Sequence, residues 1–187
     1  LVQQKAIPLV LEKKNVIVSA QTGTGKTAAF ALPIVQLLFD EQEVEKKDKK
    51  IRSLVVTPTR ELAIQILENF KSFSKYSNLE ATAVFGGVSL EPQKEILGKG
   101  VDILIATPGR LIDLQMQGHI DLSAVEIFVL DEADLMLDMG FIVDIKKIEA
   151  LCPKKKQTLL FSATMPEKIV ELAKRVIKSP VVIEINP

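Results

Sequence analysis

The chain has 187 residues, of which 47% are hydrophobic and 26% charged, values typical of one globular domain with a sizeable core. Its 24 basic and 24 acidic residues cancel, so any nucleic-acid partner must be held by local features rather than by an overall positive charge. The single cysteine, Cys152, and the single histidine, His119, exclude a disulfide framework and argue against a Cys/His metal site. We expect Cys152 in the core and His119 in a loop.

No apolar run approaches the roughly 18 residues of a membrane span, and the sequence carries no recognisable secretory signal. These features predict a cytoplasmic protein without a membrane partner. The chain begins at Leu1 rather than at methionine, so we also expect it to be a fragment of a longer protein.

Short β-rich runs alternate with helical patterns along the chain, which is the signature of βαβ units. We predict an α/β fold of three layers, with a twisted, mostly parallel sheet of about seven strands and helices on both faces. The strands are expected near residues 15–20, 53–57, 80–85, 102–107, 125–131, 157–162 and 181–185.

Three predicted helices have one apolar face, which we assign to the core. They cover residues 1–11, 60–75 and 166–177, with apolar faces formed by Val2, Ala6, Leu9 and Val10, by Leu62, Ile66, Phe70 and Phe73, and by Ile169, Leu172, Ala173 and Val176. Pro33 should kink a further helix. The charged stretch from Asp40 to Arg52 mixes both signs, which suggests a solvated helix end or a mobile loop.

The first predicted strand runs into a glycine-containing turn that opens a helix, the arrangement of a phosphate-binding loop. Its glycines would let the backbone approach phosphate, Lys26 would reach the β and γ oxygens, and the Thr27 hydroxyl would ligate Mg²⁺. A glycine-rich turn with a surface lysine is the alternative. The loop comprises Ala20, Gln21, Thr22, Gly23, Thr24, Gly25, Lys26 and Thr27, with Ala20 where the general pattern has glycine.

Asp131 and Glu132 follow an apolar strand at 127–130 that should be buried on both faces. In a site with the loop above, Asp131 could hold Mg²⁺ through water, and Glu132 could orient or deprotonate an attacking water. Alternatively, both are acids at the start of the following helix, favoured by its dipole.

Most remaining polar signals follow the carboxyl ends of strands, the edge at which open α/β sheets bind ligands. Loops at the opposite edge, such as Lys13-Lys14 and Lys154-Lys155-Lys156, show only generic charge. Two turns repeat the order Thr, Pro, any residue, Arg, which we interpret as a Thr N-cap, a Pro at the first helical position and an Arg in the first turn. They are Thr57-Pro58-Thr59-Arg60 and Thr107-Pro108-Gly109-Arg110.

An arginine at a helix N-terminus is electrostatically unfavourable, so Arg60 and Arg110 suggest anions nearby, such as polynucleotide phosphates. Pairing with surface carboxylates is the alternative. Gly86 and Gly87 would permit close backbone approach, although a tight turn explains them equally well. Thr164 fits the N-cap of a capping box with Glu167, and the Ser162 hydroxyl could bond a carboxylate of the acidic turn.

The motifs AQTGTGKT, PTRELA, GG, TPGR, DEAD and SAT, in this order and spacing, closely resemble the first RecA-like domain of DEAD-box ATP-dependent RNA helicases. The resemblance spans nearly all of residues 1–187, and alanine at position 20 is the usual form in this family. It implies a P-loop NTPase fold, ATP and Mg²⁺ as cofactors, and catalytic roles for Lys26, Asp131 and Glu132.

The resemblance also assigns the remaining motifs. Residues 2–8 look like the Q motif, which implies that Gln3 reads the adenine edge, and Asp134, Ser162 and Thr164 would couple nucleotide state to RNA. The RNA backbone path would comprise Pro58, Thr59, Arg60, Gly86, Gly87, Thr107, Pro108, Gly109 and Arg110.

The family's second RecA-like domain, with its arginine fingers, is expected to follow Pro187, and the aromatic residue upstream of the Q motif to precede Leu1. We therefore expect the isolated chain to be monomeric and weakly active or inactive. Two alternatives are an ATPase of the same superfamily that acts on DNA and a nucleotide-gated RNA clamp, although a clamp has no need of the water-activating Glu132.

Overall fold

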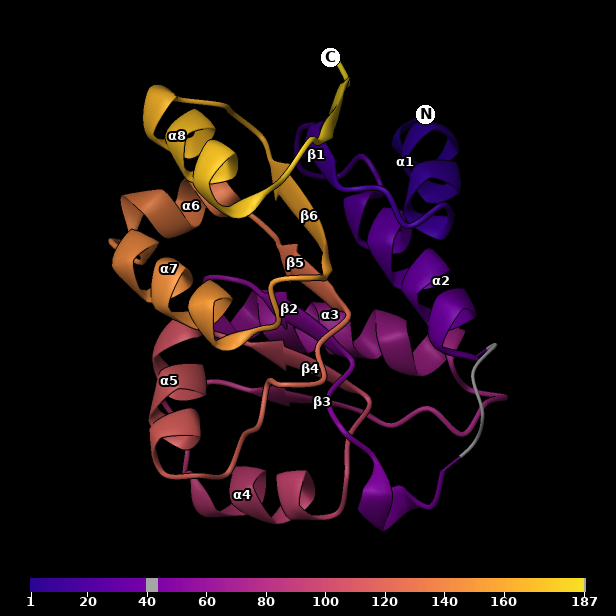
Figure 1. Ribbon diagram of the computed structural model, residues 1–187, viewed down its shortest axis with the longest axis vertical. Coiled ribbons are helices and arrows are strands. Elements are labelled where there is room, and N and C mark those ends of the chain that lie inside the picture. Colours follow the sequence, from indigo (N-terminus) through magenta and orange to yellow (C-terminus); the bar gives the residue numbers. More distant parts are fainter. Residues whose placement is uncertain (40–43, 187) are drawn as a thin grey trace.

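Seven parallel strands form one sheet in the computed structural model, which describes residues 1–39 and 44–186 (Figure 1). The sheet order is β3-β4-β2-β5-β6-β1-β7, and every described pairing is parallel. The predicted α/β class and all seven predicted strand positions are confirmed. The strands are β1 (Val16–Ser19), β2 (Ser53–Val56), β3 (Ala81–Val84), β4 (Ile103–Ala106), β5 (Ile127–Leu130), β6 (Gln157–Ser162) and β7 (Val181–Glu184).

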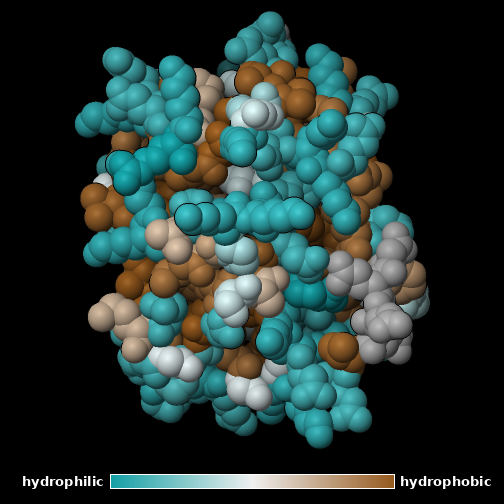
Figure 2. All heavy atoms as spheres, in the orientation of Figure 1, coloured by the Kyte–Doolittle hydropathy of each residue, from teal (hydrophilic) through white to brown (hydrophobic). Residues whose placement is uncertain are grey.

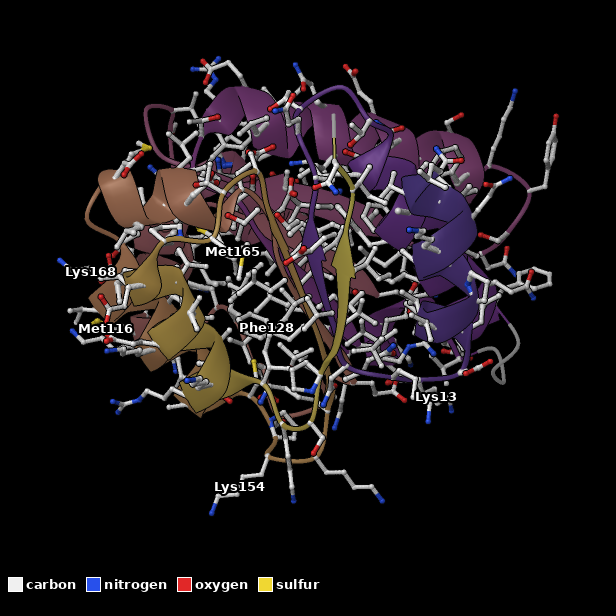
Figure 3. All side chains as sticks on the ribbon, turned by 90° about the horizontal axis from the view of Figure 1, so that it is seen from above. Lys13, Met116, Phe128, Lys154, Met165 and Lys168 are labelled. Carbon is white, nitrogen blue, oxygen red and sulfur yellow. The ribbon has the colours of Figure 1, made fainter. Side chains whose placement is uncertain are left out.

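Two hydrophobic clusters, one on each face of the sheet, divide the helices into two layers. The helices α1 (Val2–Leu11), α2 (Lys26–Phe39) and α3 (Arg60–Phe73) cover one face. The other face packs against α5 (Pro108–Met116), α6 (Ala133–Asp138), α7 (Ile142–Leu151) and α8 (Glu167–Val176), while α4 (Glu91–Gly98) adjoins β3. Figure 3 looks along the sheet between the two layers, with Phe128 of β5 in the core.

The predicted apolar helix faces are largely confirmed. The four apolar residues assigned to α8 are all buried, and so are Val2, Ala6 and Val10 of α1, whereas Leu9 is half-buried. The helix α2 continues through the buried Pro33 to Phe39. Cys152 is buried as expected, and this burial raises the pKa of its thiol to about 12, which suits an inert core residue. His119 is exposed in the turn after α5.

The charged stretch from Asp40 to Arg52 is only partly the solvated segment that its composition predicts. Residues 40–43 lie outside the described part of the chain, and Lys46–Asp48 form a short exposed 3-10 helix. The next residues are anchored, because Lys49 and Arg52 contact the buried Asp102 carboxylate at 2.6 and 3.2 Å. A buried carboxylate needs such partners, and this one ties the stretch to the start of β4.

Hydrophilic side chains cover much of the face shown in Figure 2, with apolar residues visible in groups between them. Within residues 1–39 and 44–186, no helix is long and apolar enough to cross a membrane. All seven strands point the same way, so the loops after β1 to β6 meet at one edge of the sheet, where the predicted site residues lie.

Candidate active site

The predicted phosphate-binding loop lies between β1 and α2 and adopts a conformation that needs glycine at two positions. Gly23 and Gly25 have φ angles of 84° and 85°, in the region that other residues rarely adopt. The Thr24 hydroxyl closes the turn by donating to the Gln21 carbonyl at 2.7 Å. Ala20 is buried, has no such positive φ, and donates its N–H to the Ser162 carbonyl at 3.0 Å, which explains why alanine suits this position.

Lys26, the first residue of α2, reaches across the sheet edge to the acidic turn after β5. Its Nζ atom lies 3.4 Å from Oε1 of Glu132, and the two side chains are only 6% and 14% exposed. Lys26 is therefore not the surface lysine of the alternative interpretation. Glu132 adopts a left-handed conformation, with φ 56° and ψ 49°, just before α6. Glu132 therefore occupies the N-cap position that the alternative interpretation gave it, but its side chain makes no capping bond and contacts Lys26 instead.

Asp131, the neighbour of Glu132 in sequence, is almost fully buried, and its N–H donates to the Val56 carbonyl of β2. Burial raises the pKa of Asp131 to about 7, and the neighbouring Glu132 carboxylate adds to the rise, whereas Lys26 opposes it. Burial makes the charged form of this carboxylate unfavourable, and a cation bound beside it would stabilise that form. Such perturbed groups in a cleft are characteristic of functional sites.

A cavity of about 370 Å³ joins the loop to the acidic turn. Two polar residues of α3, Gln65 and Asn69, line it as well, and our sequence analysis missed both because we assigned this helix only to the core. A polar pair four residues apart beside the apolar stripe was the available signal. The cavity is lined by Thr22, Gly23, Gly25, Lys26, Thr27, Ala28, Leu62, Gln65, Ile66, Asn69, Asp131 and Glu132.

Gln3 of α1 contacts the same loop. Its Nε2 atom donates to the Gly25 carbonyl at 3.4 Å, and a Cβ atom at position 25 would lie 2.6 Å from that nitrogen. The positive φ favours glycine at this position, whereas the Gln3 amide, at the end of an exposed and flexible side chain, could shift away from an added Cβ. The structure places the exposed Gln3 beside the loop, although Gln3 does not itself line the cavity.

Ser162, Thr164 and Asp134 form one hydrogen-bonded cluster between β6 and α6. The Thr164 hydroxyl and N–H donate to Oδ2 of Asp134 at 2.9 and 3.1 Å. The Ser162 hydroxyl accepts from the Asp134 N–H at 3.2 Å and donates to the Thr164 carbonyl at 2.6 Å. Although partial burial raises the pKa of Asp134, the hydrogen bonds from Thr164, Ser162 and Leu135 together outweigh it and hold the pKa below its usual value.

One expectation about this cluster is therefore wrong. Thr164 does not cap α8, which begins at Glu167 after Pro166 and has no side-chain cap, because its hydroxyl is bonded to Asp134 instead. The Ser162 hydroxyl bonds the Asp134 N–H and the Thr164 carbonyl, and a side-chain hydrogen bond from Ser162 also helps to lower the pKa of the Asp134 carboxyl, as expected of this position. Each hydroxyl joins the acidic turn to the end of β6.

The two Thr-Pro-x-Arg turns differ in structure, which corrects the repeat read from the sequence. The second matches the prediction in outline, with Thr107 at the N-cap and Pro108 at the first helical position, but Thr107 makes no capping bond. In the first turn the N-cap is Thr59 rather than Thr57, and its hydroxyl accepts from the Leu62 N–H at 3.2 Å. Pro58 therefore precedes the helix.

The two arginines also differ, and neither forms an ion pair with a carboxylate in the described part of the chain. The exposed Arg60 guanidinium lies 5.6 Å from the centre of the Phe85 ring. Arg110 is half-buried and donates to the Gln93 side chain at 3.1 Å and to the Val88 carbonyl at 3.0 Å. It thereby holds the loop that contains Gly86 and Gly87.

The backbone is accessible to solvent at three glycines along the carboxyl edge of the sheet. Gly86, Gly87 and Gly109 are exposed, and a Cβ atom built on any of them would meet no neighbouring atom within 4 Å. Gly87 has a φ of 81°, which the turn requires. The structure brings these glycines to the same sheet edge as Arg60 and the cavity.

Comparison with known proteins matches residues 1–172 to the family described as DEAD/DEAH box helicase. The chain is 47% identical over 186 residues to the DEAD-box ATP-dependent RNA helicase RhpA of Helicobacter pylori, which corresponds to 100% of this chain and 36% of the relative. It is 43% identical over 175 residues to the probable ATP-dependent RNA helicase MJ0669 of Methanocaldococcus jannaschii, covering 93% of this chain and 46% of the relative.

Solved structures agree. A hypothetical ATP-dependent RNA helicase from Sulfolobus tokodaii superposes with a TM-score of 0.88 at 46% identity, covering 98% of this chain and 52% of that one. A DEAD box protein from the hyperthermophile Methanococcus jannaschii gives 0.89 at 41% identity, covering 99% and 49%. The chain thus spans from about a third to half of these relatives, and it belongs to the DEAD/DEAH box helicase family.

Proposed function

We propose that residues 1–187 are the ATP-binding domain of an ATP-dependent RNA helicase, and that a second RecA-like domain completes the catalytic set. The observation that carries this proposal is the contact between Lys26 and Glu132 at 3.4 Å, because it joins a phosphate-loop lysine to a carboxylate in a shared cavity. The relatives of this chain are ATP-dependent RNA helicases by name, which supports the same activity. Without arginine fingers from the second domain, the isolated chain should be weakly active.

In this proposal the loop from Ala20 to Thr27 cradles the phosphates with its backbone N–H groups, and Gln3 contacts the adenine. A γ-phosphate would take the place of Glu132 as the partner of Lys26, which frees the carboxylate to orient or deprotonate water. Binding and activation of the nucleophile would then be linked through one ion pair.

Thr27 and Asp131 would hold Mg²⁺. The residues present fit this ion, since both line the cavity and supply hard oxygen donors, and the Asp131 carboxylate is buried beside a second carboxylate that a cation would offset. When bound, the ion supplies positive charge that stabilises the transferred phosphoryl group.

RNA is proposed to run along the same sheet edge. Backbone phosphates would meet Arg60 and the open backbone at Gly86, Gly87 and Gly109, with Pro58, Thr59, Thr107 and Pro108 shaping the path. The bonds of Arg110 to Gln93 and Val88 suggest that it contributes partly by positioning the glycine loop. Contacts of this kind position a strand without reading its sequence.

The cluster of Asp134, Ser162 and Thr164 is proposed to couple the two activities. It connects the turn that holds Asp131 and Glu132 to the end of β6, and the Ser162 carbonyl accepts from Ala20 of the phosphate loop. A shift of the acidic turn on nucleotide binding would therefore be transmitted to β6 and the phosphate loop.

The test is steady-state ATPase activity of the longer protein that contains this chain, with single-stranded RNA and DNA of equal sequence and length. We expect stimulation by RNA and little by DNA. Equal stimulation by DNA would favour the DNA-dependent alternative, and RNA binding without any turnover would favour a clamp.

A further inference from the structure

Three lysine-bearing loops meet at the sheet edge opposite the proposed nucleotide site. Lys13 and Lys14 precede β1, Lys154 to Lys156 precede β6, and Lys178 precedes β7. Because β6, β1 and β7 are parallel neighbours in the sheet, the loops before them lie side by side. In Figure 3, Lys154 extends outward below the sheet, and Lys13 lies on the same lower side.

Two adjoining cavities of about 290 and 350 Å³ open on this edge and share Asn15 and Lys156. The carboxylates that line them belong to Glu126 and Glu149, and Glu149 is already paired with Lys156 at 2.7 Å. We call the cations that line the cavities the amino-edge basic surface: Lys13, Lys154, Lys155, Lys156, Lys174, Arg175 and Lys178.

The loops are fixed to one another by amide side chains, so the cations keep a defined arrangement. Asn15 donates to the Lys178 carbonyl at 2.7 Å and accepts from the Thr158 N–H at 2.8 Å, which joins all three loops. Gln157 donates to the carbonyls of Val10 and Lys14 at 3.0 and 2.8 Å. The surface is therefore built by specific contacts rather than by unrelated flexible lysines.

Much of this positive charge has no internal partner. Lys154, Lys174 and Lys178 are exposed and form no ion pair with any residue in 1–39 or 44–186. The whole chain has a formal net charge of zero, so the excess is local. The sequence analysis assigned no specific role to the lysines of these loops, but the sheet order brings them together on one surface.

We propose that the amino-edge basic surface binds the phosphate backbone of a single RNA strand, as a second contact separate from the carboxyl-edge path. The choice of RNA rests on the proposed function. In the 350 Å³ cavity the apolar lining residues, Val176 and Ile177, are themselves buried, so this cavity presents cationic and polar groups rather than apolar surface. Lysines spread over three loops suit a chain of phosphates.

The experiment measures the affinity of this chain for a fluorescent single-stranded RNA of about 30 nucleotides at several salt concentrations. The test variant is Lys154→Gln with Lys178→Gln, and the matched control is Lys71→Gln with Lys147→Gln, two exposed lysines that line neither cavity. A third arm, Arg60→Ala, probes the carboxyl edge. Thermal unfolding verifies that each variant is folded.

Log affinity falls with log salt, and each lost phosphate contact makes this dependence shallower by about 0.7. The slope should therefore become shallower by about 1.4 in the test variant and should hardly change in the matched control. Equal losses in test and control variants, or none in the test variant, would overturn the inference. If the test variant changes the salt slope and Arg60→Ala does not, the result would support the amino-edge basic surface and contradict the contact of Arg60 with RNA. Thermal stabilisation by tripolyphosphate that the test variant abolishes, with an unchanged RNA slope, would assign the surface to small anions and overturn the RNA proposal.

Discussion

Lys26 and Glu132 are 106 positions apart in the sequence, yet their side chains form an almost buried ion pair. The pair exists because β1 and β5 both neighbour β6, so the loops that follow them converge. Each partner compensates the desolvated charge of the other, and loss of either would leave an unpaired buried charge. In the proposed function, the γ-phosphate replaces Glu132 as the partner of Lys26, and the freed carboxylate can then orient or deprotonate the attacking water.

Two carboxylates of the same turn should affect stability with opposite dependence on pH. Asp131 has a pKa of about 7 in the folded chain and 3.8 as its ordinary value, so the folded state binds more protons between these values and its contribution to stability falls as pH rises from about 4 to 7. The pKa of Asp134 is lowered instead, so its contribution is present above about pH 4 and lost below.

This difference can be tested by measuring the thermal stability of wild type, Asp131→Asn and Asp134→Asn without metal at pH 5 and pH 8. Relative to wild type, Asp131→Asn should gain stability at pH 8 compared with pH 5, by an amount on the order of a few kcal/mol. Asp134→Asn, the matched control, should lower the melting temperature equally at both values, because Asp134 is ionised at each. The same pH-independent shift in Asp131→Asn would contradict the raised pKa.

At the scale of single elements, the two Thr-Pro-x-Arg turns start helices by different means. Thr59 caps α3 with its hydroxyl, whereas Thr107 precedes α5 without a capping bond. A lost N-cap costs about 1 kcal/mol, and valine keeps the shape of threonine while removing the hydroxyl. We predict that Thr59→Val lowers the free energy of unfolding by about that amount in urea titrations, and that Thr107→Val lowers it by much less. Equal losses would contradict the assigned caps.

The elements themselves could be predicted from sequence because the cue is local. Apolar runs such as Ile127–Leu130 are buried on both faces and end at polar turns, so a reader of the sequence finds each strand and the edge where its loop lies. The phosphate loop and the acidic turn were found in this way.

Other contacts depend on the sheet order, which no local pattern encodes. The bond of Thr164 to Asp134 competes with the capping role that its neighbours suggest, and the tertiary contact prevails. Arg110 finds Gln93 and Val88 only after α5 packs beside the β3–α4 loop. Gln65 and Asn69 line the cavity from a helix whose apolar stripe satisfies the core.

At the scale of the whole molecule, the fold places the two proposed functional surfaces at opposite edges of the sheet. The carboxyl ends of the strands carry the cavity, the acidic turn and the open glycines, and the amino ends of β6, β1 and β7 carry the amino-edge basic surface. With a net charge of zero the chain has little long-range attraction for a polyanion, so the proposed RNA binding would depend on these local surfaces.

The most direct test of the account compares ATP affinity and ATP hydrolysis for Lys26→Ala and Glu132→Gln in the longer protein, with exposed Glu68→Gln as the control. Lys26 is assigned to phosphate in the ground state and Glu132 to water, so the first variant should lose ATP affinity, while the second keeps its affinity and loses hydrolysis. The control should match wild type in both. Equal loss of ATP affinity in the two site variants, or wild-type hydrolysis by Glu132→Gln, would contradict the assignment of the site.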